Sequence, residues 1–299
     1  MKNIEDQLLT IQDLTVLYNE PLSRYTGFRT GGCSTVLIPQ TYNSFLETLN
    51  FVRANEVKFY ILGNGSNVVA LDEGYNGFVI LTKKALQNIE VNGTFVSAGA
   101  GVLLSDLCRK ALDHSLSGLE FAYGIPGTIG GAVFMNAGAY GFEIKDVLRE
   151  VTVLDENNNI VSLPVENLLL SYRNSIFHER KGCIILSATF GLSNGCKEDI
   201  FGKMTELLQK RKEKQPLDFP SCGSTFKRPE GSYASKLIDD CGLKGLSLGG
   251  AEVSAKHAGF VINKGGATTS DILGLCSIIQ TIVKERTGFN LELELEILH

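Results

Sequence analysis

The chain of 299 residues has little of what metal-binding and disulfide-rich proteins carry. Its four histidines are never paired at ligand spacing, and its seven cysteines are scattered without a Cys-x-x-Cys pair. These patterns indicate neither a zinc site nor a disulfide framework, and they favour reduced intracellular thiols. We therefore expect no metal.

Long apolar runs and a strong positive charge are missing as well. Residues 1–7 form no apolar signal core, and no run reaches the ~18 apolar residues that span a bilayer. The net charge of −5 provides no basic field for nucleic acid, and the basic run at 210–214 is read as the solvated end of a helix. We expect a cytoplasmic protein, a monomer or a weak dimer, with no membrane or nucleic-acid partner.

The composition that is present is that of a globular protein, with 43% hydrophobic and 20% charged residues. Two domains are expected, because single cores rarely grow beyond about 250–300 residues. A polar helical stretch at 197–214 ends at Gln215-Pro216, which we take as the boundary. Short strands, one hairpin and a few helices predict α+β layers. Strands are expected at 57–62, 78–81, 95–98, 183–190, 259–263 and 291–298, a hairpin at 151–163, and helices at 41–52, 103–116, 234–241 and 270–286.

One segment is dense in glycine. Residues 124–141 hold six glycines in eighteen positions, with apolar residues between them. Glycine at this density weakens ordinary helix or strand, because it adds unfolded-state entropy and packs no side chain. It suits a backbone that approaches something flat or anionic, and the apolar residues predict that the segment is buried. The pattern predicts a large cofactor lying against the main chain.

A second glycine-rich segment, Gly-Asn-Gly-Ser-Asn at 63–67, follows a predicted strand. Gly-x-Gly-Ser in this position leaves successive N–H groups free and adds a hydroxyl, which is typical of a phosphate-binding nest. It is not a Rossmann fingerprint, because the third glycine would fall at Val68 and no helix clearly follows. A tight surface turn is the alternative. Together, the two segments can hold the two ends of one dinucleotide.

The segment 221–227 carries a candidate serine. Ser224 lies between a glycine and a β-branched residue, with Lys227 three positions on, and a turn-capping hydroxyl is the alternative. No Gly-x-Ser-x-Gly elbow is present, so serine-hydrolase chemistry has little support. Cys222 competes as a reactive group, although an isolated cysteine is usually a small buried side chain.

Arg173 lies between aromatic residues in the segment 171–177. Its planar fork of donors can hold an anionic group or an enolate, and a structural salt bridge is the alternative.

In the last predicted strand, Leu291, Leu293, Leu295 and Ile297 alternate with Glu292, Glu294 and Glu296, which follow one another at about 6.6–6.8 Å. Such a row is usually a solvated face, but one carboxylate can turn into a cleft.

These segments, in this order, resemble the UDP-N-acetylenolpyruvoylglucosamine reductase family, the MurB flavoenzymes of peptidoglycan precursor synthesis. The resemblance covers nearly the whole chain and is specific in combination, whereas the loop at 63–67 alone would indicate only the wider flavoprotein superfamily. The absence of an extra loop before the serine segment matches the shorter second type of the family. The motifs that carry the resemblance lie at 25–32, 61–67, 124–141, 171–177, 223–227, 246–263 and 291–298.

The resemblance implies an α+β fold with an FAD-binding part of two α+β subdomains, of the PCMH/vanillyl-alcohol-oxidase-like type. A smaller α+β substrate-binding domain follows. We place the FAD-binding part at 1–204, with subdomains at about 1–82 and 83–204, and the substrate-binding domain at 205–299. The terminal strand would return a carboxylate to the active site.

The resemblance also implies the reaction. NADPH would reduce non-covalently bound FAD, which would pass a hydride from N5 to the enolpyruvyl methylene carbon of UDP-N-acetylglucosamine enolpyruvate, giving UDP-N-acetylmuramate. Ser224 would protonate the adjacent carbon, and Arg173 and Glu294 would stabilise the enol or enolate between the two steps. Serine is a weak acid, so its hydroxyl must be polarised.

Binding residues are implied as well. Tyr172, Lys227, Lys256 and His257 would bind substrate, with Lys227 facing the diphosphate. From the residues alone, we expect His257 to satisfy a structural hydrogen bond and not to act as a base. The residues implied to bind FAD are Gly63, Asn64, Gly65, Ser66, Asn67, Gly124, Pro126, Gly127, Thr128, Gly130, Gly131, Asn136, Gly138 and Ala139.

Two positions depart from the family pattern. Glu296 stands where the family commonly has arginine, and an acidic residue there either favours the protonated form of Glu294 or removes a substrate contact. Glu252 stands where glutamine is frequent. Two alternatives remain open: a flavin oxidase of the same superfamily, which would lack the motifs at 173 and 223–227, and a non-catalytic nucleotide-binding protein, which would take up no FAD.

Overall fold

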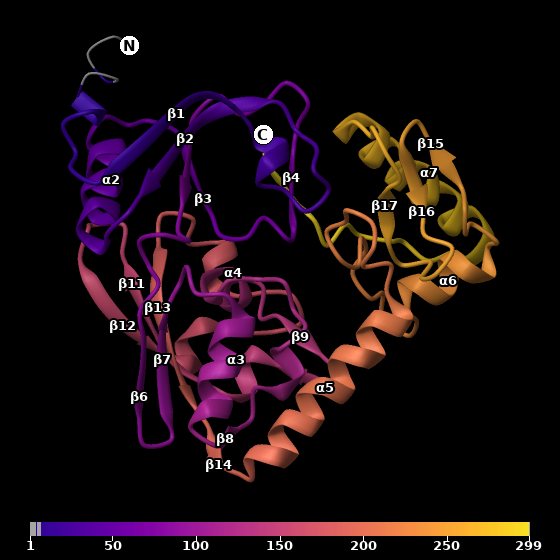
Figure 1. The fold of residues 1–299 in the computed structure, drawn as a ribbon. Coiled ribbons are helices and arrows are strands. Elements are labelled where there is room, and N and C mark those ends of the chain that lie inside the picture. The colour runs from indigo at the N-terminus through magenta and orange to yellow at the C-terminus, as the bar shows by residue number, and fades with distance from the viewer. Residues whose placement is uncertain (1–3, 5–6, 299) are drawn as a thin grey trace. The chain divides into compact units, whose positions relative to one another are not determined.

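The computed structural model describes residue 4 and residues 7–298, which divide into two compact units (Figure 1). Unit 1 comprises Met1–Leu17, Val36–Asn64 and Gly77–Gln209, and unit 2 comprises Tyr18–Thr35, Gly65–Asn76 and Lys210–His299. The segment 1–7, where we expect no signal core, lies mostly outside the described residues. His299 also lies outside them. Unit 2 takes in residues 18–35 and 65–76, which the predicted division placed in the N-terminal part. The predicted division assigned FAD to residues 1–204 and the substrate to residues 205–299, and this assignment stays a prediction.

A four-stranded sheet begins unit 1, in the order β1 (Leu14–Pro21), β2 (Cys33–Pro39), β5 (Phe78–Leu81), β3 (Phe59–Leu62). The unit boundary crosses β1 and β2. Helix α2 (Tyr42–Ala54) joins β2 to β3 and begins in a capping box between Thr41 and Ser44. Its buried side chains Phe45, Leu49 and Val52 confirm the helix predicted there.

The larger sheet of unit 1 has five antiparallel strands, in the order β12-β11-β13-β7-β6. Helices α3 (Leu104–Asp113) and α4 (Ile129–Phe134) cover it, and α4 lies against β13 and β7 (Figure 1). The predicted hairpin is confirmed, and Asp155 closes its turn by accepting the N–H groups of Asn157 and Asn159 at 2.8 and 2.7 Å. The strands are β6 (Ile89–Asn92), β7 (Phe95–Gly99), β11 (Leu148–Leu154), β12 (Ile160–Pro164) and β13 (Ile184–Gly191).

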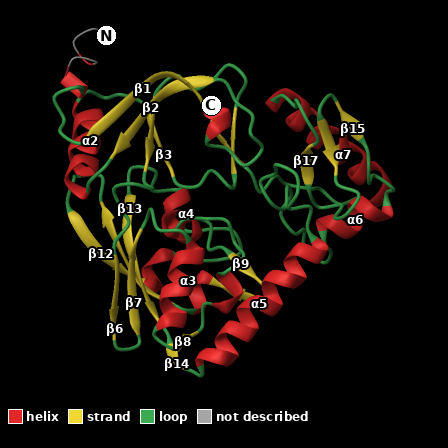
Figure 2. Cartoon of the chain, viewed as in Figure 1, coloured by secondary structure: helices red, strands yellow, loops and turns green. Residues whose placement is uncertain are grey.

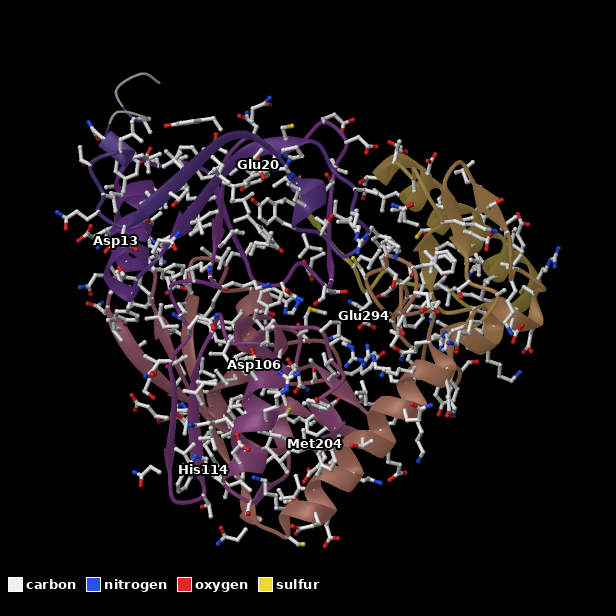
Figure 3. All side chains as sticks on the ribbon, viewed as in Figure 1. Asp13, Glu20, Asp106, His114, Met204 and Glu294 are labelled. Carbon is white, nitrogen blue, oxygen red and sulfur yellow. The ribbon has the colours of Figure 1, made fainter. Side chains whose placement is uncertain are left out.

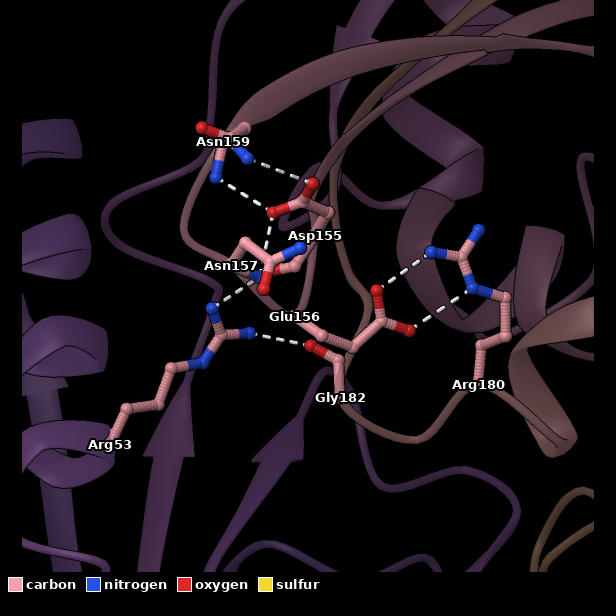
Figure 4. A network of polar contacts seen from close by, with 7 residues as sticks. All are labelled: Arg53, Asp155, Glu156, Asn157, Asn159, Arg180 and Gly182. Atoms are coloured by element: carbon pink, nitrogen blue, oxygen red, sulfur yellow. Dashed lines mark hydrogen bonds and ion pairs between the residues drawn. The ribbon is translucent and has the colours of Figure 1, made fainter.

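A polar network connects α2 to the β11–β12 hairpin within unit 1 (Figure 4). The Arg53 guanidinium donates to the backbone oxygen of Asp155 at 2.8 Å and to the backbone oxygen of Gly182. Burial lowers the pKa of Arg53, but nearby acidic groups favour its charged form. Beside it, Arg180 holds Glu156 through two hydrogen bonds of 3.0 and 2.7 Å. The network therefore attaches α2 to the β11–β12 turn and to the loop before β13.

Unit 2 has a core of its own, formed by α6 (Ala234–Asp240), α7 (Thr269–Thr287) and a three-stranded sheet, β15 (Ser247–Leu248), β16 (Ala251–Val253), β17 (Val261–Asn263). The side chain of Asp72 caps the start of α7 by accepting the N–H groups of Thr269 and Ser270, both at 2.8 Å. Strand β4 (Val68–Ala70) pairs in parallel with β18 (Glu296–Leu298). This pairing joins the loop at 65–67 to the end of the chain.

The remaining elements are short, except α5 (Lys197–Lys214), which crosses the unit boundary (Figure 2). None of the described helices is both long and apolar enough to cross a membrane. The other strands are β8 (Leu116–Ser117), β9 (Gly138–Ala139), β10 (Phe142–Glu143) and β14 (Ser193–Asn194). The 3₁₀ turns are η1 (Leu22–Arg24), η2 (Glu120–Ala122), η3 (Ile144–Asp146), η4 (Val165–Leu168) and η5 (Ile176–His178).

One element prediction is wrong. The alternation at 291–298 predicted one strand, but only Glu296–Leu298 is a strand, preceded by a single bridge between Leu293 and Phe226 and a bend at Leu295. The buried residues are Leu291, Leu295 and Leu298, so the spacing is four and three instead of two. The segment changes pairing partner within eight residues, and a period-2 pattern cannot report such a change.

Candidate functional site

The two glycine-rich segments meet in unit 1. The side-chain amide of Asn64 donates to the backbone oxygen of Pro126 at 2.7 Å, and its oxygen accepts from Lys83 at 2.9 Å. A Cβ at Gly63 would lie 2.2 Å from the Thr128 hydroxyl oxygen, so only glycine permits this approach. The structure therefore brings together the segments expected to share one dinucleotide.

A cavity of about 360 Å³ opens beside this contact, lined by the predicted cofactor residues Asn64, Gly124, Pro126 and Gly127. This size is at the lower end of ligand sites and suits one part of a dinucleotide. Other residues of its wall were missed from the sequence: Leu103, Ser105, Arg109, Tyr123, Ile125 and Leu208.

The charged group of that wall is Arg109, on the exposed side of α3. Its guanidinium carbon lies 5.7 Å from the Tyr123 ring centroid, and the guanidinium forms an ion pair of 2.8 Å with Asp106. A usable signal was present in the sequence, because Arg109 lies opposite the buried face of the predicted helix and Tyr123 directly precedes the glycine-rich segment.

The glycines at 130 and 131 differ in what they face. The N–H of Gly130 donates to the Ala100 oxygen at 2.9 Å, and a Cβ there would lie 3.0 Å from the Ala100 Cβ, so this glycine serves packing. Gly131 is exposed, with the Thr128 hydroxyl the nearest group, 3.7 Å from its ideal Cβ. The prediction that the whole segment is buried is wrong, because Pro126, Gly131 and residues 140–142 are exposed.

Asn136 is fully buried and has a φ of 41°. Its amide nitrogen donates to Glu143 at 3.0 Å and to the Ser171 backbone oxygen at 2.9 Å. Its oxygen accepts the N–H of Lys145 at 3.0 Å. The side chain of this predicted cofactor residue therefore holds protein segments together, including the one that carries Arg173.

Arg173 occupies a tight turn of unit 1. Ser171 and Asn174 exchange backbone hydrogen bonds of 3.1 and 3.2 Å, and Arg173 between them has a φ of 53°. Its guanidinium donates to the Gly138 oxygen at 3.3 Å and lies 5.0 Å from the Tyr172 ring centroid. Arg173 and Tyr172 are thus placed at the end of the glycine-rich segment.

In unit 2, the loop at 65–67 depends on one glycine. Gly65 has a φ of +64°, and a Cβ there would lie 1.8 Å from the Tyr25 oxygen. Its own oxygen accepts the N–H of Gly27 at 2.9 Å. The predicted absence of a following helix is confirmed, because strand β4 follows. The loop is therefore a turn closed against residues 25–27.

Ser224 is exposed between two differently constrained neighbours. Gly223 has a φ of +77° and open space around it, whereas Thr225 is fully buried. The N–H of Thr225 donates to the Gly259 oxygen at 2.9 Å, and its hydroxyl accepts the N–H of Val261 at 3.0 Å. Thr225 therefore fixes the backbone while the Ser224 side chain stays accessible.

Glu294 lies in the same unit, directly before the bend at Leu295 that leads into β18 (Figure 3). Its N–H donates to the Thr225 oxygen at 2.9 Å, and its backbone oxygen accepts from the Asn67 side chain at 2.9 Å. The structure thus brings the segments of Ser224 and Glu294 together. Arg173 belongs to unit 1.

The predicted substrate-binding residues of unit 2 have different partners. Lys227 lies 3.8 Å from Glu292, and both side chains are exposed, so the pair is weak. Lys256 donates to the Lys212 oxygen at 2.6 Å. His257 accepts the N–H of Gly259 at 3.1 Å on Nδ1, as expected for a structural hydrogen bond, and burial lowers its pKa.

Cys222 and Glu252 have structural environments. Cys222 is buried, and burial raises the pKa of its thiol to about 12, so it is not a reactive thiolate at neutral pH. Glu252, one of the two departures, forms an ion pair with Lys264. The backbone N–H of Glu296, the other departure, donates to the Asn67 oxygen at 2.9 Å.

Comparisons with known proteins agree with this geometry. An FAD binding domain family matches residues 33–164, and the C-terminal domain family of UDP-N-acetylenolpyruvoylglucosamine reductase matches residues 215–298. The reductase of that name from Caldanaerobacter subterraneus is 50% identical over 98% of this chain and 97% of its own length. The one from Clostridium novyi is 47% identical over 99% of this chain and 95% of its own length.

Solved structures give the same result. The crystal structure of UDP-N-acetylenolpyruvylglucosamine reductase (MurB) from Thermus caldophilus has a TM-score of 0.82 at 36% identity, covering 96% of this chain and all of that one. The fold and the FAD binding domain define an α+β flavoprotein oxidoreductase. Within that class, the chain belongs to the UDP-N-acetylenolpyruvoylglucosamine reductase family.

Proposed function

We propose that the chain reduces UDP-N-acetylglucosamine enolpyruvate to UDP-N-acetylmuramate with electrons from NADPH, in peptidoglycan precursor synthesis in the cytoplasm. Whole-length relatives that carry the reductase name support this proposal. The single observation that carries it is the hydrogen bond from Glu294 N–H to the Thr225 oxygen, because it joins the segment of a carboxylate to the segment of an exposed serine.

The residues present fit FAD. Gly131 and the cavity at 124–127 offer uncovered backbone, and Gly65 builds a turn that no other residue permits. We assign the loop at 63–67, with the hydroxyl of Ser66, to the diphosphate, and residues 124–131, 138 and 139 to other parts of the cofactor. FAD, when bound, supplies the hydride that reduces the carbon–carbon double bond.

The protein's part is to supply the proton and to stabilise charge. Ser224 donates a proton to the carbon next to the one that receives hydride, so that one hydride and one proton complete the two-electron reduction. Arg173 and Glu294 stabilise the enol or enolate between the two steps. Because Ser224 is exposed and its neighbour Thr225 is anchored, its hydroxyl can meet a substrate without a change in the backbone.

Substrate binding is assigned to Tyr172, Lys227, Lys256 and His257. Lys227 is the best diphosphate contact among them, because its exposed pair with Glu292 costs little to break. Tyr172 already lies against the Arg173 guanidinium and can hold it in place.

Anaerobic half-reactions test the proposal. Purified protein should carry FAD, NADPH should bleach it, and UDP-N-acetylglucosamine enolpyruvate should restore its colour. Ser224→Ala and Glu294→Gln should keep the first step and slow the second by about 10²-fold or more. Ser232→Ala, the same substitution elsewhere in unit 2, is the control and should behave as wild type. Recolouring by oxygen but not by the substrate would indicate an oxidase, and protein without FAD a non-catalytic chain.

A further inference from the structure

Both backbone polar groups of Glu294 are hydrogen-bonded within unit 2. On one side, its N–H donates to the Thr225 oxygen at 2.9 Å. On the other, its carbonyl accepts from the Asn67 side-chain amide at 2.9 Å. Thr225 is itself fixed by two hydrogen bonds to residues 259 and 261, whereas the Asn67 contact comes from a segment 227 positions earlier in the sequence.

Asn67 makes a second contact with the same segment. Its backbone oxygen accepts the N–H of Glu296 at 2.9 Å, and the parallel pairing of β4 with β18 begins one residue later, with Val68 opposite Glu296. The backbone of Asn67 therefore bonds the first residue of β18, two positions after Glu294. A side chain that accepts but does not donate cannot bond the Glu294 carbonyl.

The serine segment is attached to the same short stretch. The Cys222 thiol, two residues before Ser224, lies 3.5 Å from the Val68 oxygen and is buried. The segments of Ser224 and Glu294 thus both contact residues 67–68, two positions after the glycine that forms the turn.

We propose that Asn67 is a positioning residue, which fixes the Glu294 backbone to the loop that holds the cofactor. Its importance for catalysis rests on the function proposed for Glu294. Loss of the amide donor frees the Glu294 carbonyl, loosens the bend and misplaces the carboxylate. The effect is largest in the step in which Glu294 acts.

A first experiment measures the positioning itself, in full-length protein without flavin. Asn67→Asp keeps the shape but removes the donor, and Asn67→Ala removes the whole group. Hydrogen–deuterium exchange of the Glu294 and Glu296 amides should become about threefold to tenfold faster in both variants. Asn64→Asp, the same change in the same loop with contacts to Pro126 and Lys83 instead, should leave these two amides unchanged. Unchanged exchange in both Asn67 variants overturns the proposal.

A second experiment measures the consequence in the holoenzyme. Asn67→Ala should slow reoxidation by the substrate about tenfold, several-fold more than it slows flavin reduction by NADPH. In a protein that already carries Glu294→Gln, Asn67→Ala should slow reoxidation by less than about twofold, because Asn67 acts through Glu294. Slowing of both steps that excess FAD restores would make Asn67 a cofactor contact and overturn the proposal.

The two experiments separate this inference from the proposed function. If Glu294→Gln does not slow reoxidation, the catalytic role of Glu294 fails, and the exchange rates still decide whether Asn67 positions its backbone. If Glu294→Gln slows reoxidation and Asn67→Ala does not, the proposed function stands and the positioning role in catalysis is overturned.

Discussion

The two units hold their candidate catalytic residues by different means. In unit 1, Arg173 lies on a two-residue turn with a φ of 53°, and the fully buried Asn136 fixes the base of that turn. In unit 2, Ser224 and Glu294 lie on separate segments whose backbones bond to each other, and the half-buried Asn67 fixes one of them. The backbone geometry of a turn is set mainly by the few residues within it. The geometry of paired segments depends on residues that are far apart in the sequence.

The two asparagines make the comparison concrete. Asn136 bonds a carbonyl 35 residues away, and Asn67 bonds one 227 residues away. Both come from segments assigned to the cofactor, and both direct an amide to the backbone of a segment that carries a catalytic candidate. The segments proposed to bind the flavin therefore also organise the segments that carry the proposed catalytic residues.

The largest effect is expected at Arg173. Arg173→Ala should slow the substrate-dependent step about 10²–10³-fold, because a cation aimed at developing negative charge is lost. Arg173→Lys should recover only part of this, since an ammonium does not reproduce the planar fork. Stopped-flow reoxidation of reduced flavin measures both variants. An Arg173→Ala rate close to wild type would leave Arg173 with the structural role that the sequence also permitted.

The next effect concerns stability and separates the two asparagines. Asn136→Ala leaves the buried network without the acceptor of the Lys145 N–H and removes one of the two hydrogen bonds to the Ser171 oxygen, and should lower the free energy of unfolding by about 2–4 kcal/mol. Asn67→Ala should lower it by only about 0.5–1.5 kcal/mol, because its surroundings are partly open to water. Urea unfolding followed by circular dichroism measures both. Equal losses would contradict the contrast between a buried and a half-buried support.

The smallest effect is a pH dependence confined to unit 2. Burial holds the pKa of His257 below its ordinary value of 6.5, so the unfolded chain takes up this proton more readily than the folded chain. The contribution to stability is complete above about pH 6.5 and declines as the pH falls below it. His257→Gln should reduce the slope of Tm against pH in that window. An unchanged slope would show that His257 titrates alike in both states.

Local patterns predicted most of the fold. Apolar residues at helical spacing after Thr41 gave α2, and asparagines between two short strands gave the β11–β12 turn. These predictions held because caps and turns satisfy their hydrogen bonds within a few residues. The terminal strand failed because Leu293 and Glu296 pair with different partners, which alternation alone does not encode.

The candidate site divides in the same way. Glycine spacing identified the two segments that meet at Gly63 and Thr128, and the cavity beside them contains four residues expected to bind FAD. The structural roles of Asn67 and Asn136 were not predictable from the sequence. Their glycine-rich surroundings suggested that both side chains bind a ligand, whereas both donate to backbone oxygens of the protein. Arg109 was missed because its place opposite the buried face of the predicted helix is also typical of a solvated residue, and its contact with Tyr123 is formed only in the tertiary structure.

By itself, the sequence determined where the backbone turns and where glycine is required, and its motifs identified a flavoprotein reductase. These properties depend on steric limits and spacing within short segments. Only the tertiary structure decided which polar groups line a cavity and which hold the protein together. The hydrogen bond between Asn67 and Glu294 spans 227 positions, and a half-buried amide bonds whichever carbonyl the packed chain brings to it.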